Sequence, residues 1–123
     1  MLTRQRLDRL RLAVAGFWIF AGAMHFVIPR AYQSIVPPYL ADWKSELVVA
    51  SGLAEIAGGL AVLSDRTRRG ARWWLLGTLL AVFPANIHMA VNAEEFKDIP
   101  EYALWARLPF QGVFGWFIWR GTR

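Results

Sequence analysis

The fold is decided by residues 47–63, which read LVVASGLAEIAGGLAVL. This run is apolar and rich in small residues, and it carries one charged side chain, Glu55, at its centre. Its length is close to the ~20 residues that a helix needs to cross a bilayer. A carboxylate at bilayer depth is costly unless it finds a partner or a wet cavity. Glu55 is therefore a candidate functional residue by position alone.

Three more apolar blocks accompany this run. Residues 12–29 and 73–93 contain no Asp, Glu, Lys or Arg, and residues 102–119 contain only Arg107. Hydrophobic residues make up 56% of the chain and come in blocks, a pattern typical of membrane helices. We predict an all-α fold, in which residues 1–123 form one four-helix transmembrane bundle. The predicted helices cover residues 11–28, 46–64, 71–92 and 102–119.

The connection at residues 29–45 is too apolar for an ordinary loop and too broken by proline to span a membrane. It carries Tyr32, Tyr39 and Trp43, which are residue types that favour the headgroup layer. We predict a short interfacial segment, with a short helix and a turn at Pro37-Pro38, that lies over the outer end of the bundle.

The net charge of +5 is informative through its distribution. Ten of the 14 basic residues precede the first predicted helix, separate the second from the third, or follow the fourth. The positive-inside rule then places both termini in the cytoplasm of a multi-pass protein of the bacterial inner membrane. On this interpretation the charge indicates contact with the lipid bilayer, and no nucleic-acid partner is expected.

Polar groups from all four predicted helices fall in the outer half of the membrane. Counted from the helix ends at ~1.5 Å per residue, they lie at similar depth. An ion pair between Glu55 and Arg107 is the cheapest arrangement for two charges in that layer. The predicted ligand-binding residues are His25, Glu55, Asn86, Arg107 and Gln111.

Two other interpretations of these residues compete with a binding site. Interhelical polar contacts often only fix helix register, so the layer can be purely structural. Two histidines in a membrane bundle also suggest a site for haem or for a metal ion. Asn86 and His88 are two residues apart, however, so they face opposite sides of a helix, and we predict that His88 points away from the site. No metal site is predicted, and haem is disfavoured.

Five segments together resemble the DoxX-like family of small integral membrane proteins. They are AMHF at 23–26, IVPPYL at 35–40, SGLAEIAGG at 51–59, FPANIHM at 83–89 and RLPFQ at 107–111. The resemblance covers nearly the whole chain in order, and by position it implies the same five site residues. It implies a four-helix inner-membrane protein, from a family whose members or relatives are linked to thiosulfate:quinone oxidoreduction, to an oxidative-stress complex with superoxide dismutase and a sulfurtransferase, and to methylamine dehydrogenase maturation.

The leading hypothesis is a subunit of a membrane redox system that binds a quinone or another small amphiphile. Glu55 and His25 would handle protons, and Arg107, Asn86 and Gln111 would orient a carbonyl or anionic group. The alternatives are a non-catalytic scaffold or assembly subunit, and a carrier of small molecules or lipids, with protein partners or a homo-oligomer in either case. The chain has no cysteine, which excludes thiol–disulfide chemistry of its own. Whether the protein is an enzyme stays open.

Overall fold

The computed structural model describes residues 2–96 and 99–123, which are mostly helical and contain no strand. Its α-helices are α1 (Leu2–Val27), α2 (Pro29–Gln33), α3 (Lys44–Val62), α4 (Arg68–Val91) and α5 (Glu101–Gly121). Two short 3₁₀ helices, η1 (Pro38–Trp43) and η2 (Ala93–Glu95), lie in the connections. The prediction of an all-α chain is confirmed.

The helix boundaries follow proline and the charged turns. α1 ends at Val27, just before Pro29, which begins α2 at a position where its missing N–H is tolerated. The predicted interfacial segment 29–45 contains α2 and η1, with η1 beginning at Pro38. The prolines inside the long helices, Pro84 and Pro109, interrupt neither α4 nor α5.

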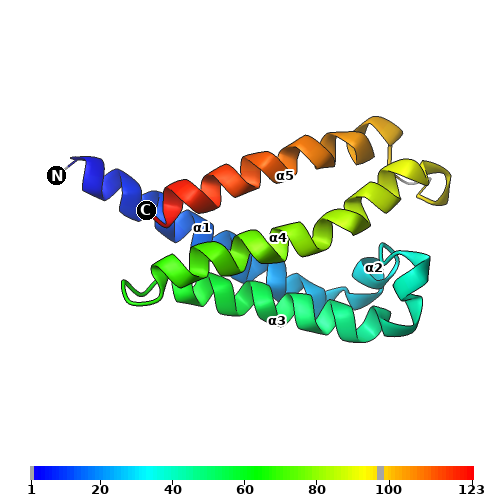
Figure 1. Ribbon diagram of the computed structural model, residues 1–123, viewed down its shortest axis with the longest axis horizontal. Helices are drawn as coiled ribbons and strands as arrows, with labels where there is room; N and C mark the ends of the chain where they lie inside the picture. The colour runs from blue at the N-terminus through cyan, green and yellow to red at the C-terminus, as the bar shows by residue number, and fades with distance from the viewer. Residues whose placement is uncertain (1, 97–98) are drawn as a thin grey trace.

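The four long helices run side by side along the length of the molecule (Figure 1). α1 packs mainly against α3, α4 lies between α3 and α5, and α5 also contacts α1. The N-terminal turns of α1, the α3–α4 turn and the C-terminus gather at one end, whereas α2 lies at the other (Figure 1). We call these the arginine end and the α2 end. A core that includes Val14, Val62, Leu75 and Ile118 joins all four long helices near the arginine end.

Three of the described helical segments are long and apolar enough to cross a membrane: Arg9–Val27, Pro38–Val62 and Arg68–Val91. α5 falls outside that set. It carries Glu101, Arg107 and Arg120, and much of its surface is aromatic rather than aliphatic.

Glycines bring α1 and α3 into close contact. A Cβ added to Gly22 would lie 2.6 Å from the Gly52 carbonyl oxygen, and a Cβ on Gly59 would lie 2.9 Å from that of Ala15. Contacts this short leave no room for any side chain, so the two backbones touch along most of their shared length. Gly58 faces α4 instead, where Leu75 fills the space.

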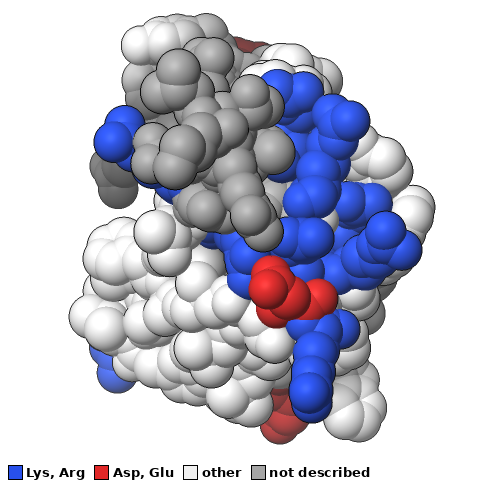
Figure 2. All heavy atoms as spheres, turned by 90° about the vertical axis from the view of Figure 1, so that its left-hand side faces the viewer, with Lys and Arg blue, Asp and Glu red and all other residues white. Residues whose placement is uncertain are grey.

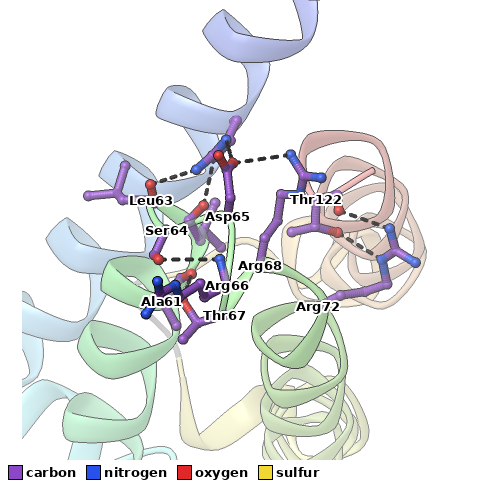
Figure 3. A network of polar contacts seen from close by, with 11 residues as sticks. Ala61, Leu63, Ser64, Asp65, Arg66, Thr67, Arg68, Arg72 and Thr122 are labelled. Carbon is purple, nitrogen blue, oxygen red and sulfur yellow. Dashed lines mark hydrogen bonds and ion pairs between the residues drawn. The ribbon is translucent and has the colours of Figure 1, made fainter.

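At the arginine end, arginine side chains bind the last carbonyls of two helices (Figure 3). Arg11 in α1 donates through Nε to the Val62 carbonyl at 2.7 Å and through Nη2 to the Leu63 carbonyl at 2.6 Å. Its Nη1 pairs with Asp65 at 2.9 Å. Because the last turn of a helix leaves its carbonyls without N–H partners, Arg11 completes the C-terminus of α3 from a neighbouring helix.

Arg72 does the same for α5. Its Nε donates to the Thr122 hydroxyl at 3.0 Å and its Nη2 to the Thr122 carbonyl at 2.9 Å. The hydroxyl in turn donates to the Ile118 carbonyl at 2.6 Å. The ends of α3 and α5 are thus each fixed by an arginine that comes from the first turns of the preceding long helix in the bundle.

Candidate functional site

The candidate site is built on a buried histidine–glutamate contact between α1 and α3. His25, in the last turn of α1, and Glu55, near the middle of α3, are each only 6% exposed. His25 Nδ1 lies 3.3 Å from Glu55 Oε2. The contact depends on Gly52, because a Cβ there would lie 2.8 Å from the Cβ of His25. The close approach of the two helices therefore sets the two side chains against each other.

The hydrogen bonds of this contact are incomplete. His25 Nδ1 lies 2.8 Å from the Ala21 carbonyl oxygen, and since a carbonyl only accepts, Nδ1 carries the hydrogen. In the neutral imidazole, Nε2 is then an acceptor. Glu55 Oε2 is buried and has no hydrogen-bond partner among the described residues. A buried polar oxygen without a donor is destabilising and calls for an explanation.

Tyr32 of α2 covers the histidine. Its ring stacks on the imidazole of His25 with centroids 3.9 Å apart and planes 19° apart. Burial raises the pKa of the Tyr32 phenol, the charge of Glu55 raises it further, and the charge of Arg107 opposes that rise. The phenol is therefore within electrostatic range of both an acid from α3 and a base from α5.

Arg107 does not form the expected ion pair with Glu55. In the described part of the chain, its side-chain contact is a weak one, from Nη1 to the Met89 sulfur at 3.5 Å, and it remains exposed. The physical reason is the order of the helices: α3 packs mainly against α1 and α4, whereas α5 packs mainly against α4 and α1. Glu55 therefore contacts His25 on the adjacent α1 and not Arg107. The guanidinium is left with unused donors near Tyr32.

Asn86 and Gln111 are both half-buried. Across the described residues, neither side chain hydrogen-bonds to another protein group or to the His25–Glu55 contact. The structure therefore brings together His25, Glu55 and Tyr32, with Arg107 beyond the tyrosine, and it leaves the two amides outside this set.

His88 is engaged elsewhere, at the end of α4. Its Nε2 lies 3.5 Å from Glu95 Oε2, its Nδ1 lies 3.1 Å from the Asn92 amide nitrogen, and its ring meets Phe96 edge-on. These contacts match the prediction that it points away from the site. Within residues 2–96 and 99–123, no group of three or more His, Asp or Glu side chains is placed to hold a metal ion.

Sequence reasoning placed Tyr32 in the headgroup layer and missed its contact with His25. No periodicity relates the two, because the helix breaks between them at Pro29. A signal does exist in the composition: the connection is apolar and aromatic, which favours packing back onto the bundle. Ile35 in the same connection does so, packing against Met89 and Leu104 of α4 and α5.

The comparisons with known proteins give a family without an assigned activity. The chain belongs to a family described as a domain of unknown function (DUF8561), which matches residues 14–120 and so includes every residue of the candidate site. No curated protein and no solved structure matches the chain.

Proposed function

We propose that this member of the DUF8561 family is a four-span protein of the bacterial inner membrane that binds a quinol or a similar small amphiphile at the His25–Glu55 contact. The proposal has two parts, the placement of the helices in the membrane and the chemistry of the site.

In the proposed placement, α5 is a fourth membrane span in addition to the three apolar segments. α5 has 21 residues, about 31 Å of helix at ~1.5 Å per residue, and it packs beside α1 and α4. Arg107 lies near one end of α5, from which a long side chain can reach the headgroups. With four spans, the arginine end faces the cytoplasm by the positive-inside rule, and both termini lie on that side.

One observation favours a ligand-binding site at the His25–Glu55 contact over a contact that only packs the helices together. Glu55 Oε2 is buried and lacks a donor, although His25 and Tyr32 lie beside it. A contact that served only to hold helices together would gain by satisfying that oxygen. A ligand hydroxyl would supply the missing donor, and the free guanidinium of Arg107 could then bind a carbonyl or anionic oxygen elsewhere on the ligand.

In this arrangement Glu55 accepts the hydrogen bond, and at the next step the proton, of a ligand hydroxyl. His25 Nε2 is a second acceptor, held in orientation by the bond from Nδ1–H to Ala21 and by stacking on Tyr32. Asn86 and Gln111 lie on the flanking helices and can adjust to the ligand. A diphenol such as a quinol fits because it has hydroxyl groups at both ends and a flat apolar body. The resemblance to DoxX-like proteins points the same way.

The test is binding of a short-chain ubiquinol or menaquinol to the purified protein in detergent, followed by tryptophan fluorescence. Glu55→Gln should weaken binding about tenfold, because a hydrogen bond to a charged acceptor is stronger than one to a neutral amide. Glu46→Gln changes an exposed glutamate on the same helix and should have no effect.

Binding that is equal in the wild type and in Glu55→Gln would reject the site. If the wild type binds neither quinol, and no small molecule copurifies by mass spectrometry, the scaffold interpretation replaces the proposal.

A further inference from the structure

A second surface joins basic and aromatic side chains at the arginine end. On α4, an arginine is followed by an arginine and a tryptophan three and four residues later, and on α5 a tryptophan is followed by a tryptophan and an arginine at the same spacing. Residues spaced this way share one face of a helix. The α4–α5 surface consists of Arg69, Arg72, Trp73, Trp116, Trp119 and Arg120.

Contacts between the two helices make this surface continuous. The rings of Trp73 and Trp119 meet edge-on with centroids 5.9 Å apart. The guanidinium of Arg72 lies 4.3 Å over the Trp119 ring, and that of Arg120 lies 5.8 Å over Trp116. The first two of these contacts connect the face of α4 with the face of α5, and the third lies within α5.

The charges on this surface differ in their availability. Arg72 spends two of its donors on Thr122. Arg69 and Arg120 are exposed, and neither makes a side-chain hydrogen bond or an ion pair with the described side chains, those of residues 9–96 and 99–123. Asp65, in the turn between α3 and α4, is already paired with Arg11 (Figure 3). Figure 2 shows the basic area at this end, where Arg69 and Arg120 have no anionic partner among the described side chains.

The aromatic part is exposed as well: Trp73 by 63%, Trp116 by 56% and Trp119 by 42%. Tryptophan rings with an apolar body and a polar edge favour the boundary between headgroups and acyl chains. With the helices placed in a membrane as proposed above, Arg69 and Arg120 beside them would lie at the level of the lipid phosphates. An anion that matches both parts must carry negative charge next to hydrocarbon.

We propose that the α4–α5 surface binds the headgroup of an anionic phospholipid, with its phosphate on Arg69 and Arg120 and its upper acyl chain on Trp73 and Trp119. Basic pockets between membrane helices on the cytoplasmic side suit anionic lipid headgroups. The inference depends on the placement of the helices in a membrane and not on the His25–Glu55 site. A soluble phosphate would leave the exposed tryptophans uncovered, which favours the lipid.

The experiment uses the full chain in phosphatidylcholine vesicles that contain a few per cent of either phosphatidylglycerol or phosphatidylcholine with brominated acyl chains. Bromine quenches tryptophan fluorescence only at short range, so selective quenching reports a lipid held against these rings. Brominated phosphatidylglycerol should quench the wild type more than brominated phosphatidylcholine at the same mole fraction. Arg69→Gln/Arg120→Gln should weaken that preference by roughly 30-fold for the two charges together.

Arg9→Gln/Arg66→Gln is the matched control, because it removes two exposed arginines at the same end but outside the α4–α5 surface. It should retain most of the preference. An equal loss in both double variants would show diffuse attraction and overturn the proposal. So would equal quenching of the wild type by the two lipids, or displacement of the brominated lipid by excess inorganic phosphate at constant ionic strength.

Discussion

The arginine end and the middle of the bundle treat polar groups in opposite ways. At the arginine end, Arg11 and Arg72 meet the carbonyls of Val62, Leu63 and Thr122 with bonds of 2.6–2.9 Å. In the middle of the bundle, Glu55 Oε2 is buried beside His25 and has no donor among the described residues. Stability alone favours the first arrangement, and the second is retained where a protein has another use for an unsatisfied group.

The difference separates residues that hold the helices from residues that are free to act. The arginines add contacts that the last turns of α3 and α5 lack by themselves. Glu55 instead removes stability from the interface that contains it. Substitutions at the arginine end and at Glu55 should therefore change stability with opposite sign, provided that the close contact between α1 and α3 is intact.

The largest effect is expected at that shared contact. Gly59→Leu would place a side chain against the Ala15 carbonyl, 2.9 Å from the added Cβ, and against Ile19 at 2.7 Å. We expect it to lower the free energy of unfolding by about 3 kcal/mol or more, because neither helix can yield without separating. Denaturation in detergent measures this. Gly77→Leu is the control, since its Cβ meets nothing within 4 Å, and similar losses in the two variants would contradict the close packing of α1 on α3.

The next effect tests the arginine end. Arg72→Met keeps the aliphatic stem and removes two charged hydrogen bonds to Thr122, so the free energy of unfolding should fall by about 2 kcal/mol. Amide exchange at residues 118–122 should rise at the same time. Arg69→Met, measured without anionic lipid, should change neither quantity. If Arg72→Met were as harmless as Arg69→Met, the clamp would contribute nothing to the end of α5.

Glu55→Gln tests the buried contact in the middle of the bundle and should change stability with the opposite sign. Removing a buried charge that lacks a donor should raise the free energy of unfolding by about 1 kcal/mol, while quinol binding falls. Glu46→Gln serves again as the exposed control. A clear loss of stability in Glu55→Gln would mean that the carboxylate is satisfied after all, and the contrast between this site and the arginine end would vanish.

The smallest effect identifies the partner of Glu55. A double-mutant cycle of His25→Ala with Glu55→Ala should give a coupling of about 0.5 kcal/mol, in keeping with a 3.3 Å contact that is not a full hydrogen bond. The cycle of Glu55→Ala with Arg107→Ala should be additive. A larger coupling to Arg107 than to His25 would reverse this assignment and restore the ion pair expected from the sequence.

The helices could be predicted from the sequence because each depends on local features. The apolar blocks predicted where the helices lie. Their ends were predicted from Pro29 and from the charged turn between α3 and α4. α3 begins at Lys44 and ends at Val62, where 46–64 was predicted. α4 and α5 also begin earlier than predicted, at Arg68 and Glu101, because charged first turns remain helical while lying outside the apolar block.

The pairing inside the site could not be predicted in the same way. Depth along a helix placed Glu55 and Arg107 in one layer, but depth does not say which helices are neighbours. In the order of helices around the bundle, α1 packs beside α3 through Gly22, Gly52 and Gly59. Because of this packing, Glu55 contacts His25 and not Arg107. The glycines were visible in the sequence, whereas the helix that they face was not.

The two arginine clamps also divide the chain into comparable halves. Arg11 reaches Val62 across 51 residues of sequence, and Arg72 reaches Thr122 across 50. Each half is a pair of long helices whose first member closes onto the end of its second, so the molecule is a tandem of two similarly fastened hairpins. During synthesis the first hairpin has all the residues of its own clamp before α4 is made. The ribosome can therefore deliver this protein to the membrane as two successive units, each complete when its last turn emerges.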